Sequence, residues 1–316
     1  MLKRKFRKLV NNPKLFFSDM AIKHSDKISY LKPKKMEGHY QYTVVSAVYN
    51  VGRYLDDYFE SLVKQRLDFK KHIQLVLVDD GSTDNSADII KKWQKKYPNN
   101  IQYIYKENGG QASARNLGMQ YVKTEWVTFI DPDDLLDLEY FLALDKYMFT
   151  NSVRNISIVS CNLIFYYEDL KQYSDTHPLK FKYVEDKIIS IKDIKNRFQL
   201  SASSAFFKRS IIEANKISFN KNVKPNFEDG KFISEYLLKC TNYEIAYIKS
   251  AKYIYRKRSD GSSTLDQSWS DVRRFDDVLQ HGYLDLIKTS MKENGNPGIQ
   301  IISATLMDEW REVANC

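Results

Sequence analysis

Four short apolar runs alternate with three amphipathic segments between Thr43 and Ile130, and this alternation limits the chain to few folds. Apolar, β-branched runs of this length predict strands that are covered on both faces, and the intervening segments carry apolar residues at helical spacing. The predicted strands are Thr43–Val48, Ile73–Val78, Ile101–Tyr105 and Trp126–Ile130, and the predicted helices are Tyr54–Gln65, Ser86–Tyr97 and Ser113–Tyr121. This order predicts an α/β domain with a doubly wound, mostly parallel sheet.

Each predicted strand ends in a polar cluster. The clusters are Tyr49-Asn50, Asp79-Asp80, Asn108-Gly109-Gly110 and Asp131-Pro132-Asp133-Asp134. In doubly wound sheets, ligands bind beyond the carboxyl ends of the strands. Carboxylates, amides and glycines are the groups that a nucleotide and a metal ion require. The pattern therefore predicts a nucleotide site at one rim of the sheet.

Composition excludes several classes of protein. With 43% hydrophobic residues and three cysteines without paired spacing, neither a disordered chain nor a disulfide scaffold is expected. No apolar run approaches the roughly 20 residues that cross a bilayer, and no signal-peptide core is visible. The five histidines lack metal-ligand spacing. A cytoplasmic protein is the expectation.

The positive charge is concentrated at the N-terminus. The chain has a net charge of +9, and residues 1–40 contain eleven Lys or Arg against three Asp or Glu. The near-neutral remainder argues against a nucleic-acid partner. Apolar residues such as Phe6 and Phe16 lie among these cations, which is typical of an interfacial segment. Peripheral membrane contact through residues 1–35 is one interpretation, and a basic helix packed on the body is the other.

The acidic cluster after Trp126–Ile130 is a candidate metal site. Adjacent carboxylates repel one another unless a cation or a hydrogen-bond donor compensates. Oxygen ligands select Mg²⁺ or Mn²⁺, which bridge carboxylate to diphosphate. The alternative is an acidic turn that caps the following helix through Asp133 or Asp134. The second acidic strand end at Asp79-Asp80 favours the metal interpretation.

Four segments together resemble the successive motifs of family 2 glycosyltransferases, which have the GT-A fold. These segments are VSAVYNVGRYL, QLVLVDDGSTDNSADII, KENGGQASARNLGM and WVTFIDPDD. They cover roughly residues 42–140, and FEDGKF and YIYRKRSDGSS resemble later regions of the family more loosely. Relatives of this kind build bacterial capsule, teichoic-acid-like polymers and lipopolysaccharide.

Charge, sequence pattern and the resemblance together predict four parts of the chain. They are a basic N-terminal segment (1–40), the nucleotide-binding half of the GT-A domain (41–140), its acceptor and catalytic half (141–265) and C-terminal helices (266–316). In the second half we expect strands at Asn155–Val159, Leu163–Tyr167, Ala205–Phe207 and Glu244–Tyr255, and a helix at Phe232–Leu238.

By the same resemblance, four residues would bind the nucleotide of a UDP-sugar. Tyr49 would lie against the uracil and Asp80 would accept a hydrogen bond from the base, whereas Asp79 would serve the turn. Gly110 would allow close approach of the backbone to the donor. Arg115 would contact the base or the neighbouring acidic loop.

The metal and diphosphate would be held by a second group. Asp131 would bind the ribose or orient the metal shell, and Asp133 would ligate Mn²⁺ or Mg²⁺ directly. Asp134 is expected to be a further ligand or a helix cap. Arg258 and Ser262 would contact the diphosphate from a basic, hydroxyl-rich loop.

Glu228 and Asp229 match the family's acidic pair. Inverting transfer needs one base on the face opposite the leaving diphosphate, and we expect Asp229 to be that base, with Glu228 orienting it or the acceptor. The alternative is that both are carboxylates favoured at a helix N-terminus.

The sequence thus predicts a metal-dependent inverting glycosyltransferase. It would move a hexose or N-acetylhexosamine from a UDP-sugar to a hydroxyl of a bacterial surface-polysaccharide acceptor, at the inner face of the cell membrane. The chain would be part of a larger polymerase or act alone. The alternatives are a nucleotidyltransferase that makes a nucleotide sugar and a non-catalytic nucleotide-sugar-binding module.

Overall fold

The computed structural model describes residues 41–177, 179–193, 201–221, 228–240 and 243–259. The basic N-terminal segment, Ser262 and the predicted C-terminal helices lie outside the described residues. The division of the chain into four parts therefore stays a prediction.

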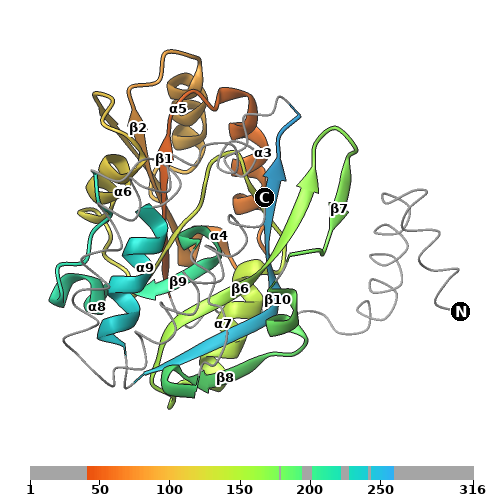
Figure 1. Ribbon diagram of the computed structural model, residues 1–316. Helices are drawn as coiled ribbons and strands as arrows, with labels where there is room; N and C mark the ends of the chain where they lie inside the picture. The colour runs from red at the N-terminus through yellow and green to blue at the C-terminus, as the bar shows by residue number, and fades with distance from the viewer. Residues whose placement is uncertain (1–40, 178, 194–200, 222–227, 241–242, 260–316) are drawn as a thin grey trace, which may run out of the picture.

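The described residues form a mixed sheet with helices on both faces (Figure 1). The strands are β1 (Tyr42–Val48), β2 (Ile73–Asp80), β3 (Ile101–Lys106), β4 (Trp126–Phe129), β5 (Leu135–Leu136), β6 (Ile156–Tyr167), β7 (Gln172–Ser174), β8 (Lys187–Ser190), β9 (Ala205–Lys208) and β10 (Glu244–Lys257). The helices are α3 (Gly52–Val63), α4 (Phe69–His72), α5 (Ser86–Lys96), α6 (Gln111–Met119), α7 (Tyr140–Thr150), α8 (Arg209–Ala214) and α9 (Glu228–Lys239). The main path of the sheet is β3-β2-β1-β4-β9-β6-β10-β5.

The predicted parallel half is confirmed. Strands β1 to β4 all pair in parallel, in the order β3-β2-β1-β4. The chain reverses its direction of travel across the sheet between β1 and β4, and a crevice outside the strand ends forms at such a switch point. The polar residues that follow β1 and β4 are therefore brought to the same crevice.

Helices cover the two faces because successive side chains of a strand point to opposite sides. Val44, Leu75 and Leu77 pack in a core with α3, α5 and α7, whereas Val45 and Val78 pack in a second core with α6, α8 and α9. Figure 1 shows α6, α8 and α9 gathered on one side of the sheet.

One glycine allows α6 to lie close to the sheet. A Cβ atom at Gly118 would be 2.5 Å from Cγ1 of Val45 and 3.3 Å from Cγ2 of Val78. Any side chain at Gly118 would therefore push α6 away from β1 and β2. Because α6 carries Arg115, this contact also fixes the height of that side chain above the sheet.

The second half of the sheet is mixed. Strand β9 pairs antiparallel with both β4 and β6, and β10 pairs parallel with β6. The two strands expected at Asn155–Val159 and Leu163–Tyr167 form the single strand β6. Helix α7 was not predicted, because its sequence YFLALDKYMFT is largely apolar and has no clear polar face. None of the helices in the described part of the chain is both long and apolar enough to cross a membrane.

Candidate active site

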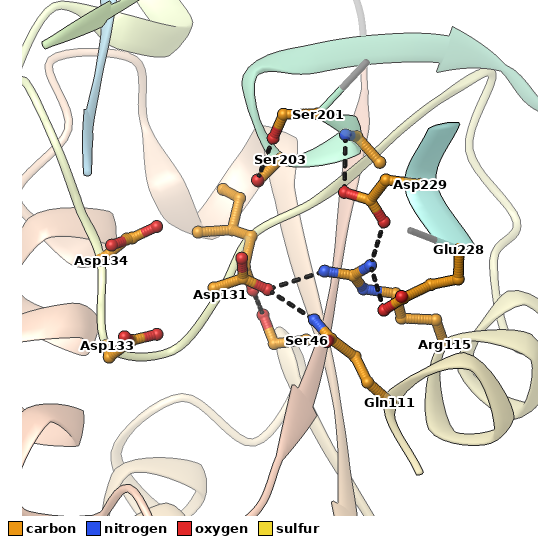
Figure 2. Close-up of polar contacts among 12 residues, drawn as sticks. Ser46, Gln111, Arg115, Asp131, Asp133, Asp134, Ser201, Ser203, Glu228 and Asp229 are labelled. Carbon is orange, nitrogen blue, oxygen red and sulfur yellow. Dashed lines mark hydrogen bonds and ion pairs between the residues drawn. The ribbon is translucent and has the colours of Figure 1, made fainter. Parts of the chain in front are cut away.

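The name crevice is used here for the region beyond the ends of β1 and β4, where the switch point predicts a ligand site. Ser46, in β1, donates a hydrogen bond of 2.6 Å to the carbonyl of Ile130 and another hydroxyl contact of 2.7 Å joins it to Tyr58. These buried hydrogen bonds hold the end of β4 against β1. Asp131, the next residue, therefore enters the crevice from a fixed backbone position (Figure 2).

Asp79 and Asp80, at the end of β2, have different hydrogen-bond partners. Asp79 accepts hydrogen bonds of 2.8 Å from the amide of Ser82 and from the hydroxyl of Tyr103. Gly81 has a φ of 78°, in the left-handed region that favours glycine. The expectation that Asp79 serves the turn is confirmed.

Asp80 organises the glycine loop before α6. Its carboxylate accepts hydrogen bonds from the amides of Gly109 at 3.0 Å and Gly110 at 2.7 Å, and it pairs with Lys106. Gly110 has a φ of 84°, and no atom lies within 4 Å of the position its Cβ would take. The loop is therefore open on the crevice side, as close approach of a ligand to the backbone would require.

Arg115 connects the end of β4 with the start of α9. Its Nη2 donates to Oδ1 of Asp131 at 2.8 Å, and its Nη1 donates to Oδ1 of Asp229 and lies 3.7 Å from Oε1 of Glu228 (Figure 2). The guanidinium also lies 5.2 Å from the centre of the Phe219 ring. Only 2% of the Arg115 side chain is exposed, so three acidic residues share one buried cation.

Two more groups fix these carboxylates. Gln111 donates through Nε2 to Oδ1 of Asp131 at 3.1 Å, and the amide of Ala202 donates to Oδ2 of Asp229 at 2.9 Å. Asp229 therefore has a donor on each oxygen. Sequence reasoning missed Gln111 and Ala202, since neither residue type marks a site by itself.

The pKa values of the group are shifted by burial and by the charges. Burial raises the pKa of Asp229, the Arg115 cation opposes that rise, and the Asp131 carboxylate adds to it. The pKa of Arg115 is raised, although its burial acts in the opposite direction, because Asp229, Asp131 and Glu228 surround it. Asp229 is therefore a better proton acceptor than an ordinary aspartate.

Asp133 forms an ion pair at the other side of the crevice. The guanidinium of Arg258 approaches Oδ2 of Asp133 at 2.8 Å through Nε and at 2.6 Å through Nη2. The same guanidinium lies 5.5 Å from the centre of the Tyr54 ring. Burial raises the pKa of Asp133, while Arg258 lowers it. The structure thus brings together two of the predicted donor-site residues.

Asp134 is buried and contacts β10. Its two oxygens accept hydrogen bonds from the hydroxyl of Tyr253 and, at 2.8 Å, from the amide of Arg256. The prediction that Asp134 or Asp133 caps a helix is wrong, because β5 follows and the next helix begins at Tyr140. Burial and the neighbouring Asp133 raise the pKa of Asp134.

The remaining predicted residues occupy different surroundings. Tyr49 is 51% exposed, just beyond β1, where its ring is accessible to a ligand. Glu228 and Asp229 both lie in the first turn of α9, as the helix-terminus alternative also expected. Lys106 was not predicted, although the β2–β3 register places it directly opposite Asp80.

These features define a class of protein: a sheet ordered β3-β2-β1-β4, with carboxylates at its switch point, is the GT-A arrangement. The chain belongs to glycosyl transferase family 2, whose family profile matches residues 43–215.

Two curated relatives are named as minor teichoic acid biosynthesis proteins. The minor teichoic acid biosynthesis protein GgaB of Bacillus subtilis (strain 168) is 32% identical over 253 residues, which cover 79% of this chain and 27% of GgaB. GgaA of the same organism is 28% identical over 255 residues, which cover 80% of this chain and 55% of GgaA. The chain thus spans about a quarter and about half of the length of these two relatives.

Solved structures show the same fold. TarS 1–349 of S. aureus, in complex with UDP-GlcNAc, superimposes with a TM-score of 0.59 at 18% identity, over 84% of this chain and 79% of that one. The mannosyltransferase PcManGT of Pyrobaculum calidifontis, in complex with GDP-Man and Mn²⁺, gives a TM-score of 0.56 at 17% identity, over 95% and 86% of the two chains.

Proposed function

We propose that this chain is the catalytic part of a metal-dependent, inverting glycosyltransferase that uses a UDP-sugar. The acceptor would be a hydroxyl of a cell-surface polymer, and the sugar a hexose or N-acetylhexosamine. Membership of family 2 favours this proposal over a nucleotidyltransferase. The intact carboxylates of the crevice favour it over a non-catalytic binding module.

The observation that carries the proposal is the pair of contacts that Arg115 makes. They place Asp229, at the start of α9, beside Asp131, at the end of β4. In the proposed reaction, Asp229 takes the proton of the acceptor hydroxyl, and that oxygen attacks the anomeric carbon of the sugar. The bond to the diphosphate breaks on the opposite face, so UDP leaves and the configuration inverts.

Asp229 suits this task because of its surroundings. Its raised pKa strengthens it as a base, and the amide of Ala202 and the guanidinium of Arg115 fix its orientation. Glu228 is buried next to it and would orient the acceptor or Asp229. A positioned base of this kind contributes roughly 10²–10⁴-fold to the rate.

The proposal includes a divalent metal on the donor side of the crevice. Asp131 and Asp133 offer the hard oxygen ligands that Mn²⁺ and Mg²⁺ prefer. Among the described residues, no three His, Cys, Asp or Glu side chains converge on one point. We therefore assign Asp133 as ligand, with Asp131 close by and the remaining ligands coming from diphosphate and water. The metal would neutralise charge on the departing diphosphate.

The nucleotide would lie across the ends of β1 and β2. Tyr49 offers an exposed ring to stack on the uracil, and Asp80 holds the open Gly109-Gly110 loop. Support for a uridine donor comes from TarS, whose structures contain UDP and UDP-GlcNAc. Arg258 would then release Asp133 and bind the diphosphate. Ser262, which follows Arg258 in the chain, would contact the diphosphate as well.

The acceptor is proposed from the relatives. GgaB and GgaA are teichoic acid biosynthesis proteins, and a further relative is a poly(ribitol-phosphate) beta-glucosyltransferase of Bacillus spizizenii. A polymer hydroxyl at the inner face of the cell membrane is therefore the acceptor that we propose, within a larger polymerase or alone.

The direct test is release of UDP from a panel of UDP-sugars, with and without Mn²⁺. The proposal expects metal-dependent hydrolysis of one donor by the wild-type chain and a rate roughly 10²–10⁴-fold lower for Asp229→Asn. Thermal stabilisation by nucleoside triphosphates but not by UDP would favour a nucleotidyltransferase. A matched control is Asp88→Asn, because Asp88 is an exposed acidic residue of α5 that takes part in none of the hydrogen bonds or ion pairs described above.

A further inference from the structure

The edge of the molecule at the amino-terminal ends of the parallel strands, opposite the crevice, is rich in lysine. Helix α5 runs from the strand carboxyl ends back to this edge, and α4 leads directly into β2. We use the name basic edge for the lysines of these two helices. They are Lys70, Lys71, Lys91, Lys92, Lys95 and Lys96, and all six are exposed.

The lysines of α5 occupy one side of the helix. At about 100° per residue, the four lysine positions span an arc of about 140°. The buried residues Ile90 and Trp93 lie outside this arc and pack into the core. The arc therefore faces solvent as a single charged stripe.

Contacts between α4 and the end of α5 join the two lysine groups. The rings of Phe69 and Tyr97 lie 5.2 Å apart, and Nζ of Lys70 lies 5.8 Å from the centre of the Tyr97 ring. The side chain of Asn100 donates to the carbonyls of Phe69, Lys70 and Ile73 at 2.8–3.1 Å. The basic edge is thus one rigid surface, with an aromatic ring between its lysines.

The cations of the basic edge are not neutralised within the described part of the chain. None of the six lysines forms an ion pair there. The nearby acids have other partners: Asp68 accepts from the amide of Lys70, and Asp56 accepts from the indole of Trp93. Asp88 is the exposed acid of α5, in its first turn, toward the crevice end.

The strongly basic segment 1–40 joins the body at the same edge. Tyr42, the first residue of β1, is in register with Ile73, which directly follows α4. The segment, with its eleven Lys or Arg and three Asp or Glu, is therefore attached beside the basic edge. The described chain thus begins beside the basic edge.

We propose that the basic edge docks on a membrane surface that contains anionic phospholipid. Lysines attract such a surface through its negative potential, and an amphipathic ring such as Tyr97 suits the headgroup region. Docking by this edge points the crevice, at the opposite ends of the strands, away from the bilayer. This inference does not depend on the reaction proposed above.

The test compares full-length variants in sedimentation with vesicles of phosphatidylglycerol and phosphatidylcholine. Lys70, Lys71, Lys95 and Lys96 are changed together to Gln, in wild-type protein and in a background with Lys3, Arg4, Lys5, Arg7 and Lys8 also changed to Gln. The matched control changes four exposed lysines of the second half of the sheet to Gln, namely Lys146, Lys171, Lys239 and Lys249.

We expect the basic-edge variant to lose roughly 600-fold in partition coefficient, at about fivefold for each of the four lysines, and the control to bind more tightly than it. Changing the same four residues to Arg should retain wild-type binding to the vesicles. That result would show that the Gln variant loses binding because charge is removed and not because of a folding defect. Equal losses in the basic-edge and control variants would overturn the proposal. So would binding to soluble polyphosphate without binding to the vesicles, since that result would define a polyanion site instead.

Discussion

Arg115, in the middle of α6, donates a hydrogen bond to Asp229, in the first turn of α9, across 114 positions of the sequence. The same guanidinium contacts Asp131 at 2.8 Å. One buried cation thus joins the donor side of the crevice to the proposed base. Its charge opposes the rise in the pKa of Asp229 that burial causes.

Removing this charge should move the pH dependence of transfer. In Arg115→Gln the pKa of Asp229 is expected to rise further, because burial is no longer opposed by the cation. A base works only when deprotonated, so the acid limb of the kcat/KM profile should shift to higher pH. Arg115→Lys keeps a cation and should shift the limb less. An acid limb that stays in place in Arg115→Gln would contradict the coupling.

Asp133 is expected to decide metal binding. Asp133→Asn removes the charge of the proposed ligand and should abolish Mn²⁺ binding in the presence of UDP, measured by electron paramagnetic resonance. Transfer should disappear with it, and the thermal unfolding midpoint should change little, because Asn can still accept from Arg258. Undiminished transfer by the wild-type chain in EDTA would show that no metal takes part.

Asp134 should matter for stability instead. Asp134→Ala leaves the Tyr253 hydroxyl and the Arg256 amide without their acceptor in a buried place. Each orphaned group costs roughly 1–3 kcal/mol, so the free energy of unfolding should fall by roughly 2–6 kcal/mol. Urea denaturation measures this loss. A fully stable variant that has lost Mn²⁺ binding would identify Asp134 as a ligand after all.

Local patterns were sufficient for the first half of the fold. Strands β1, β2 and β4 are buried on both faces and therefore appear in the sequence as short apolar runs, and α3 and α5 have clear polar faces. Helix α7 escaped prediction because six of its residues are buried, including Asp145, and no periodic stripe remains. The fused strand β6 depends on pairing with β10, which lies far along the chain.

The residues of the candidate site could be predicted from the sequence, but the contacts between them could not. The carboxylates of the crevice follow strands, and a position at a strand end is visible in the sequence. The partners of these carboxylates are remote: Asp133 pairs with Arg258, and Asp134 accepts from Tyr253 across 119 positions. The sequence alone therefore did not show that Asp134 binds β10, whereas its neighbours Asp131 and Asp133 belong to the candidate site.

Asp80 is expected to affect donor binding more than chemistry. In Asp80→Ala the amides of Gly109 and Gly110 lose their acceptor, and the loop before α6 loses its fixed shape. The affinity for UDP should fall by roughly 10-fold, which corresponds to about 1.4 kcal/mol of binding free energy. The rate at saturating donor should change less. Calorimetry that returns wild-type affinity for UDP would refute this assignment.

The central claim is that Asp229 is the base of an inverting transfer. Asp229→Asn keeps the size of the side chain and an acceptor oxygen for Arg115, but the amide cannot take a proton. Binding of UDP and Mn²⁺ should survive, and Glu228→Gln should reduce turnover less, because an amide can still orient the acceptor.

The most direct measurement is turnover of Asp229→Asn at saturating donor, together with the anomeric configuration of the wild-type product by NMR. The account predicts a loss of roughly 10²–10⁴-fold and an inverted anomeric centre. Near-normal turnover is what a purely helix-terminal role would give, because Asn serves there about as well as Asp. That result, or a product with retained configuration, would contradict the account.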